Sequence, residues 1–574
     1  MFARRSPWPL PPLIGRRWLL ATVTLAVACS SSPAPRPEPT QTVEAQAPAP
    51  APVTRAAPAL PKPDFLELIP ADTPFFFAAL APLPAGYAAR EYLSRLAAYE
   101  KVRPAIERLR QKRPREMKRL GFLVRLQISL LAELGGAVSP EKLASIGLDP
   151  STTGALYGLG MNPVVRIRLS DPKRFAAALD RMAGRLKPIA RGELGGQRYY
   201  AAREDAVLWI IAVAGRDLVI ALLPPAQRAA WLPLLFGQRR PERSLAGDNR
   251  LAELAAAHGL SPVGLGYADI GAMAGGLGGP MAAPCHEELK QLAASVPRIA
   301  VGLTAASATE MRAHSVVETS PDVARALMSL GGELPASAAT AAAAPFEITA
   351  GVDMGALITW LSGSFGRIAA SPFRCPALDW INHLARSQGG VLRKASRTLA
   401  GVRGARLAVR EIEGLVSGTT DFFLLLGSDR PAEVLGRLAP ALGARAPSIQ
   451  PGDPAVELAS SLGAGFGKVH VALGPRAVAL AVGTDGSELA GMVGAAPAPQ
   501  LPLVSMRVDP QAVAPLLRMG VSAGDPRIAA LDRELARNLA EIEVLDLERF
   551  DDLTLTVRAT ARGIEVDLDG RYPR

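Results

Sequence analysis

The sequence predicts an α+β protein: two related lobes of largely antiparallel sheet with packed helices, carried behind a disordered tether. Three observations predict this architecture. The N-terminal part of the chain has the pattern of an export signal, followed by a Pro/Ala-rich stretch that lacks a core-forming pattern. Strand and helix patterns fill the remainder, and most of them occur twice in the same order. Hairpins joined to short helices are typical of antiparallel sheets that carry helices on a face.

Residues 1–28 have the pattern of a signal peptide, with a basic start and a short apolar run, Trp18–Ala28. The basic residues are Arg4, Arg5, Arg16 and Arg17. About 20 apolar residues are needed to span a bilayer, and this run is too short. The alternatives are an anchor that is never cut and a chance apolar N-terminus. The Arg16-Arg17 pair is also compatible with a twin-arginine export signal.

Leu25–Cys29 (LAVAC) resembles the bacterial lipobox, in which the signal peptide is cut before a Cys that then carries lipid. The resemblance implies that Cys29 is lipidated and that the protein is anchored to a membrane of the bacterial cell envelope. Ser30 follows this Cys. A residue other than Asp at that position implies, by similarity to enterobacterial sorting, that the protein is an outer-membrane lipoprotein.

Residues 29–63 form the tether, which contains many Pro and Ala residues and cannot bury enough apolar area to fold. Pro-rich chains extend by about 3.1 Å per residue, so a tether of roughly 35 residues reaches up to about 100 Å from the membrane. Two shorter breaks follow, at 333–345 and at 495–502. We therefore place lobe one at 64–332, a linker at 333–345 and lobe two at 346–574.

Composition limits the classes of partner. The net charge of the 574-residue chain is +11, and removal of four signal-peptide arginines leaves a modest positive charge. Nucleic-acid binding requires clustered charge and an accessible partner, so we expect no nucleic acid as a partner. Aromatic residues make up 5% of the chain, which predicts a core of Ala, Leu and Val.

The three cysteines predict one disulfide. With Cys29 lipidated, Cys285 and Cys375 remain, and an even remainder in an exported protein favours a bond between them. Two free thiols, or pairing with another chain, are the alternatives. His286 adjoins Cys285, but the other histidines are scattered without ligand spacing. We therefore expect neither a metal site nor a cofactor.

Four units recur at offsets near 240–260 residues. Such long-period self-similarity predicts two related lobes. The matched pairs are Val164–Leu169 with Phe422–Leu426, the hairpins Ile211–Leu222 and Val471–Val482, the strands Gly264–Asp269 and Leu503–Asp509, and the closing strand pairs Arg298–Thr304 with Met311–Glu318 and Leu553–Ala559 with Ile564–Leu568. A weaker match joins the strand at Phe75–Phe77 to Phe346–Val352.

Several aspartates fall where a strand pattern gives way to a helix pattern, so we expect them to cap helices by accepting backbone N–H groups. They are Asp171, Asp269, Asp353, Asp429 and Asp509.

A basic stretch, 101–119, has no close counterpart in lobe two. Its cluster of arginines and lysines is a candidate contact for anionic lipid headgroups or another acidic envelope polymer. The alternative is a solvated helix face whose long side chains cover apolar surface. The candidate residues are Arg108, Arg110, Lys112, Arg113, Arg115, Lys118 and Arg119.

Three short motifs fail as catalytic or metal sites. Gly520–Gly524 matches G-x-S-x-G, but a helix pattern precedes it and no His follows it. Gly463–Lys468 departs from the spacing of a phosphate-binding loop. Asp567–Gly570 hints at a calcium loop, but its alternation with apolar residues is that of a half-buried strand.

Leu68–Pro74 (LIPADTP), together with Ser244-Leu245-Ala246 and Asp248, resembles motifs of uncharacterised secreted bacterial lipoproteins of a domain-of-unknown-function class. The likeness covers roughly 65–320 and extends more loosely over lobe two. The resemblance implies a surface lipoprotein of high-GC-content, Arg-rich bacteria such as myxobacteria, and it supplies no catalytic residues.

The leading hypothesis is a non-enzymatic envelope lipoprotein. Its two-lobed body would bind a partner protein, or an apolar or anionic ligand such as a lipid, at the lobe interface. The alternatives are a periplasmic enzyme with a carboxylate-based site and a structural spacer.

Overall fold

The structure is a computed structural model, and it describes most of the two lobes. The described residues are 60–91, 104, 122–135, 139–186, 188–276, 283–335, 344–411, 421–442, 447–458, 468–483, 486–496, 498, 501–514 and 547–573. The sites predicted outside these residues are Cys29, Arg108, Arg110, Lys112, Arg113, Arg115, Lys118 and Arg119, and the motifs Gly463–Gly467 and Gly520–Gly524 also lie outside them.

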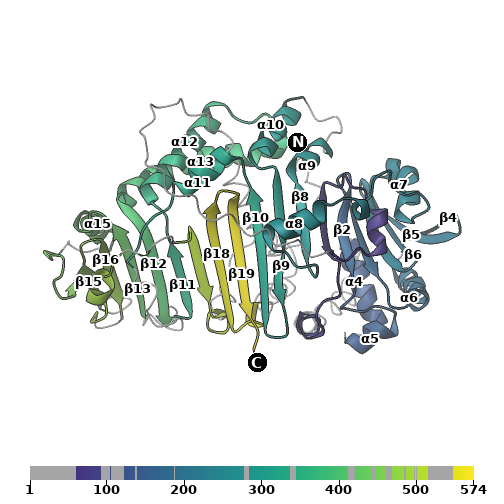
Figure 1. The fold of residues 1–574 in the computed structure, drawn as a ribbon, viewed down its shortest axis with the longest axis horizontal. Helices are drawn as coiled ribbons and strands as arrows, with labels where there is room; N and C mark the ends of the chain where they lie inside the picture. The colour runs from purple at the N-terminus through teal and green to yellow at the C-terminus, as the bar shows by residue number, and fades with distance from the viewer. Residues whose placement is uncertain are drawn as a thin grey trace.

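The prediction of an α+β fold is confirmed, and all the described strands join one 19-stranded sheet (Figure 1). The strands of lobe one are β1 (Phe75–Ala79), β2 (Gly154–Leu159), β3 (Asn162–Arg168), β4 (Ala190–Leu194), β5 (Gln197–Glu204), β6 (Val207–Ala214), β7 (Asp217–Leu223), β8 (Leu265–Asp269), β9 (Arg298–Ala306) and β10 (Glu310–Glu318). Those of lobe two are β11 (Phe346–Ala350), β12 (Val402–Glu411), β13 (Asp421–Ser428), β14 (Val456–Leu458), β15 (Val469–Leu473), β16 (Ala477–Val482), β17 (Val504–Val508), β18 (Asp552–Thr560) and β19 (Gly563–Arg571).

Every pairing in the sheet is antiparallel. From one edge to the other the strands follow the order β4-β5-β6-β7-β3-β2-β1-β8-β9-β10-β19-β18-β17-β11-β12-β13-β16-β15-β14. Strands β10 and β19 join the two lobes edge to edge, with Glu310 opposite Arg571 at one end and Glu318 opposite Gly563 at the other. The sheet therefore does not stop at the lobe boundary.

The strand order has the same pattern on both sides of the β10–β19 junction. Strands β9, β8, β1, β2, β3, β7 and β6 follow β10, and β18, β17, β11, β12, β13, β16 and β15 follow β19 in the corresponding places. Each matched pair of sequence segments occupies equivalent positions in this order. Beyond β6 the sheet continues with β5 and β4, and beyond β15 it continues with β14. Among the described strands, lobe one therefore has one more strand at its edge.

Helices cover both faces of the sheet near its two ends and gather along one end of the central strands (Figure 1). They are α4 (Phe122–Glu133), α5 (Pro140–Ser145), α6 (Pro172–Arg185), α7 (Arg228–Leu235), α8 (Arg250–His258), α9 (Ile270–Gly276), α10 (Ala283–Ser295), α11 (Pro321–Met328), α12 (Met354–Ala370), α13 (Asp379–Leu399), α15 (Pro431–Leu438) and α17 (Leu489–Val493). Short 3₁₀ helices are η1 (Asp64–Leu68), η2 (Pro225–Gln227), η3 (Leu245–Gly247), η5 (Pro376–Leu378) and η6 (Ala439–Leu442).

The apolar pattern of each strand reflects how many of its two faces are covered by helices. β16 (AVALAV) is apolar throughout, and every residue in it is buried because helices pack on both of its faces. β19 instead alternates apolar Ile564, Val566 and Leu568 with acidic side chains. Its apolar side packs partly against α11, and the opposite side carries polar groups.

Two glycines at hairpins are required for different structural reasons. Gly215 lies in the β6–β7 turn with φ +61°, a conformation that favours glycine. Gly474 follows β15, and a Cβ there would lie 2.2 Å from the carbonyl oxygen of Val493. The second glycine is therefore required by the close approach of α17.

Helix capping is confirmed for four of the five predicted aspartates. Asp171, Asp269, Asp353 and Asp509 accept backbone N–H groups within the first turn that follows each. The prediction for Asp429 is wrong: its carboxylate pairs with Arg403 at 2.9 Å and with Arg476 at 3.2 Å. The neighbouring Ser428 hydroxyl accepts the N–H of Arg430 instead.

A disulfide joins Cys285 of α10 to Cys375, which precedes η5, as the sequence predicts. Both residues are buried with Leu289, Phe365 and Ile368 in an apolar cluster shared by the two lobes. The Glu288 carboxylate accepts the N–H groups of Arg374 and Cys375 at 2.8 and 2.9 Å. The bond is therefore a second tie between the lobes, beside the β10–β19 pairing.

Replacing both cysteines by serine is expected to lower the free energy of unfolding by up to about 4–5 kcal/mol, because the bond closes a long loop in the unfolded chain. Denaturant titration under oxidising conditions measures the difference. Under reducing conditions the wild type and the double variant should unfold at the same denaturant concentration. A double variant as stable as the oxidised wild type would contradict the structural role.

Candidate functional site

One face of the sheet is apolar across strands of both lobes. Residues paired in register point to the same side of a sheet, so the pairs can be followed from strand to strand. Phe77 lies opposite Leu156, and Leu156 lies opposite Val165. Ala313 of β10 lies opposite both Leu303 of β9 and Leu568 of β19. This apolar face therefore extends from β3 to the lobe junction.

A groove of about 700 Å³ lies on the lobe-one part of this face. Its floor is formed by β1, β2, β3, β8, β9 and β10, through alternate side chains. The floor includes Phe77, Leu156, Val165, Ile167, Val301, Leu303 and Ala313. Leu143 of α5, with the following Leu148 and Pro150, forms a wall. Leu156 is 37% exposed, which is unusual for a large apolar side chain in mid-sheet.

The local fold holds this wall in place. Ser139 caps α5 by accepting the N–H of Lys142 at 3.2 Å. Gly147 follows with φ +84°, and a Cβ there would lie 2.1 Å from the carbonyl oxygen of Asp171. A glycine is needed at this position, and the turn sets Leu148 beside the groove.

Apart from Arg166, three of the described residues that line the groove are of a polar type: Asp149, Thr152 and Thr153. Arg166 also lines it, but its side chain lies on the opposite side of the sheet, because Val165 and Ile167 take the groove side. There the Arg166 side chain is 1% exposed, and its guanidinium contacts Asp217 at 3.2 Å and the carbonyl oxygen of Leu235 at 2.6 Å. Arg166 therefore contributes backbone atoms to the lining of the groove, while its positive charge lies on the far side of the sheet.

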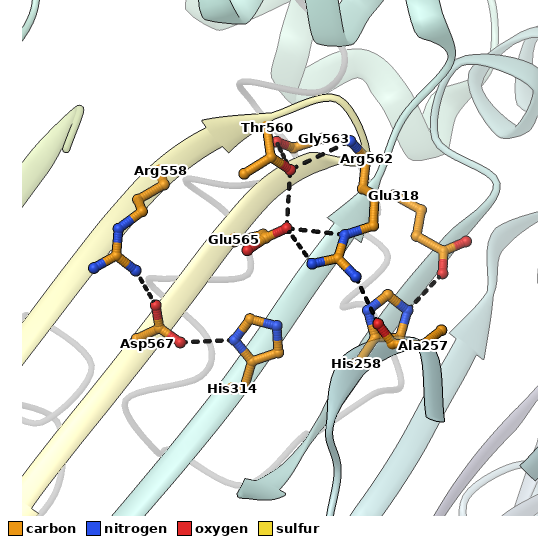
Figure 2. Close-up of polar contacts among 10 residues, drawn as sticks. All are labelled: Ala257, His258, His314, Glu318, Arg558, Thr560, Arg562, Gly563, Glu565 and Asp567. Atoms are coloured by element: carbon orange, nitrogen blue, oxygen red, sulfur yellow. Dashed lines mark hydrogen bonds and ion pairs between the residues drawn. The ribbon is translucent and has the colours of Figure 1, made fainter. Parts of the chain in front are cut away.

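A polar cluster occupies the opposite face at the lobe junction (Figure 2). His314 of β10 and Asp567 of β19 are register partners, and the His314 Nδ1 lies 2.7 Å from an Asp567 carboxylate oxygen. Arg558 of β18 also pairs with Asp567. On the other flank His314 lies opposite Gly302, which has no side chain to fill the space beside it. His258 of α8 comes close there, its ring centroid 6.4 Å from that of His314.

Glu318 receives donors from two elements of lobe one. The His258 Nε2 lies 3.0 Å from its carboxylate, and Arg298 of β9 donates through two nitrogens at 2.8 and 3.1 Å. Burial by itself would raise the pKa of Glu318. The hydrogen bonds from His258 and Arg298, together with the charge of Arg298, hold that pKa below its ordinary value.

The turn between β18 and β19 reaches back to lobe one (Figure 2). Arg562 in this turn pairs with Glu565 at 2.8 Å, and the Thr560 hydroxyl donates to the same carboxylate at 2.9 Å. Arg562 also donates to the carbonyl oxygen of Ala257, near the C-terminal end of α8. A cation at a helix C-terminus is favourable, so this contact fastens the hairpin of lobe two onto a helix of lobe one.

Charge in the cluster is balanced. Arg298, Arg558 and Arg562 face three carboxylates, and each carboxylate has a close cationic partner. The hydrogen bonds of both imidazoles go to carboxylates, and the Thr560 hydroxyl is engaged with Glu565. Ion pairs of this kind hold elements together, so the cluster is best explained as a structural tie, in which the buried Nδ1 of His258 is left without a hydrogen-bond partner.

The sequence predicted neither the groove nor the cluster. In the sequence, His258 and His314 belong to the scattered histidines, and Asp567 belongs to a motif that hints at a calcium loop but alternates as a half-buried strand. One signal was present: His314 and Asp567 lie 253 positions apart, close to the repeat offset. The same spacing relates the pair Ala306–Met311 beside the β9–β10 turn to the pair Ala559–Ile564 beside the β18–β19 turn. His314 and Asp567 are thus equivalent positions of the two lobes that meet at the junction.

No known protein family, curated protein or solved structure matches this chain. Within the described residues, none of the helices has the length and apolar character to cross a membrane. The described part of the chain also holds no group of three or more His, Cys, Asp and Glu side chains arranged to bind a metal ion.

Replacing Glu318 by Gln is expected to lower the free energy of unfolding at neutral pH by about 1.5–3 kcal/mol, because hydrogen bonds to a charged group are lost. The lowered pKa means that the ionised carboxylate stabilises the fold above its ordinary pKa, and this stabilisation is lost as the pH falls through the lowered value. Denaturant titrations from neutral pH into the acid range should therefore show the two proteins converging. Glu310→Gln, on the same strand, is the control and should change little, and a difference that grows toward acid pH would contradict the assignment.

Proposed function

We propose that the protein is a non-enzymatic envelope lipoprotein that binds an apolar small molecule in the groove of lobe one. The observation that carries the proposal is the groove of about 700 Å³ on an apolar sheet face. Ligand sites typically measure about 300–1,000 Å³ and are lined mainly by apolar side chains, with few polar groups. The hypothesis from sequence placed the ligand between the lobes, whereas this groove lies on lobe one and ends at the junction.

The shape of the groove favours a chain-like ligand. Its floor crosses six neighbouring strands. Strands in a sheet lie about 4.8 Å apart, so the floor extends roughly 24 Å across the strand direction. An acyl chain laid across the strands would contact Val165, Leu156, Phe77, Val301 and Ala313 in turn.

The envelope location rests on the lipobox-like sequence before Cys29, and the disulfide supports it. A buried Cys285–Cys375 bond suits an oxidising compartment. In this proposal the lipid on Cys29 anchors the protein to a membrane, the outer membrane by similarity of Ser30, and the tether lets the body reach ligands or an envelope partner protein. The basic residues from Arg108 to Arg119 would contact anionic headgroups.

We also infer that the two lobes arose by duplication, since their strand orders correspond. The lobes then diverged in this part of the fold. At the place in lobe two that corresponds to the groove floor, Met354 and Leu399 pack with Ala405 and Leu424 in one apolar cluster. Lobe two thus fills with its own side chains a space that lobe one leaves open, which supports a binding role for lobe one and a supporting role for lobe two.

Cys29→Ser is expected to move the protein from the membrane to the soluble fraction and to abolish incorporation of radiolabelled palmitate. Fractionation of cells that produce each form measures both. Membrane retention of the variant would contradict lipid anchoring and favour an uncut N-terminal anchor.

Leu156→Asp is expected to weaken binding of the uncharged fluorophore N-phenylnaphthylamine at least roughly tenfold, because ligand binding would bury an unpaired carboxylate. Fluorescence titration of the delipidated protein measures the affinity. Val391→Asp is the matched control: Val391 is another exposed large apolar residue, 60% exposed on α13 and away from the groove.

Equal affinity of the Leu156→Asp and Val391→Asp proteins for the fluorophore would contradict the groove as the binding site. Thermal unfolding of each variant tests whether it is folded. Leu156→Trp gives a second test that adds no charge, since it fills the groove with an apolar ring and should also weaken binding.

A further inference from the structure

The polar groups at the groove define the chemistry of its ligand further. This inference rests on the proposed function, since it concerns the same groove. Thr153 directly precedes β2 and its carbonyl oxygen accepts the N–H of Arg168, so alternation turns its side chain to the far side of the sheet, with that of Ala155. The other two residues of the described lining with uncharged or acidic polar side chains, Asp149 and Thr152, lie on the segment that leads from α5 into β2. They therefore lie together at one part of the groove, and the remaining lining is apolar.

Asp149 is held in a fixed position. One of its carboxylate oxygens accepts the backbone N–H of Ser151 at 2.8 Å and the Ser151 hydroxyl at 2.7 Å. Both contacts use Oδ1, and these are the contacts of the carboxylate among the described residues. The rim therefore carries a negative charge and the hydroxyl of Thr152.

An anionic ligand end would meet a repulsive charge here. A carboxylate or phosphate group is normally bound by Arg, Lys or backbone N–H groups that neutralise it. The one arginine of the described lining directs its guanidinium to Asp217 and the Leu235 carbonyl on the far side of the sheet. Like-charge contacts exclude wrong ligands, so the rim selects against acids.

A hydroxyl-bearing end would be accepted. An O–H group can donate to the Asp149 carboxylate, and the Thr152 hydroxyl can both donate and accept. We infer that the groove takes a lipid with an uncharged, hydroxyl-bearing polar end, such as an acylglycerol, and discriminates against fatty acids and phospholipids with an anionic end. This narrows the ligand from the apolar or anionic class expected from sequence to an uncharged lipid.

The test is a titration of the full delipidated chain with a monoacylglycerol and with the fatty acid of the same chain length, at a pH where the acid is ionised. The expected result is at least roughly tenfold tighter binding of the monoacylglycerol, a difference of about 1.4 kcal/mol. Asp149→Asn keeps an oxygen that can accept from Ser151 and removes the negative charge. The preference for the monoacylglycerol over the fatty acid should therefore become smaller in this variant. Glu193→Gln, on the exposed strand β4, is the control and should leave the ratio unchanged.

The outcomes separate the two proposals. Binding of the fatty acid as tightly as the monoacylglycerol would overturn the selectivity and leave the binding function standing. An unchanged affinity ratio in Asp149→Asn would also overturn the assigned role of the rim. Binding of neither lipid, with N-phenylnaphthylamine also unbound, would overturn the proposed function itself.

Discussion

The pairing of β10 with β19 is the constraint on which the rest of the structure depends. It converts two lobes into one antiparallel sheet, and it brings His314 and Asp567 together as register partners. Contacts on both faces secure it: α11 packs over Ile564 and Val566 on one side, and Arg562 reaches Ala257 on the other. Pairing strands from distant parts of a chain costs conformational entropy, because a long loop must close. The contacts on both faces and the disulfide offset this loss of entropy.

The joined sheet also explains where a ligand can bind. Two domains joined by a hinge can bind a ligand in the cleft between them. Where two lobes share one continuous sheet, the surface available to a ligand is a face of that sheet. On one face the central strands present balanced ion pairs, which hold α8 and the β18–β19 turn in place. On the other face they are apolar, and the described helices of lobe one leave Leu156 and its neighbours partly exposed. The proposed binding surface is thus a consequence of unequal helix coverage of the two lobes.

Local sequence patterns predicted the elements well, because periodicity and capping are local properties. Val164–Leu169, the hairpin at Ile211–Leu222 and the alternating strand from Ile564 all fold as predicted. Asp429 did not cap, because Arg403 and Arg476 compete for it, and neither arginine is near it in sequence. The groove and the His314–Asp567 pair were missed for the same reason: strand order, register and helix coverage are set by long-range pairing, which alternation within one strand does not encode.

Native-state hydrogen exchange at increasing denaturant, on the Cys285→Ser/Cys375→Ser double variant, tests most directly whether the β10–β19 pairing makes the lobes one unit. Without the disulfide, backbone pairing and side-chain packing alone hold the lobes together. We predict that amides of β6 and β7 in lobe one and of β15 and β16 in lobe two become exchangeable at the same denaturant concentration, together with those of β10 and β19. Exchange of one lobe's strands while the other lobe stays protected would contradict the account.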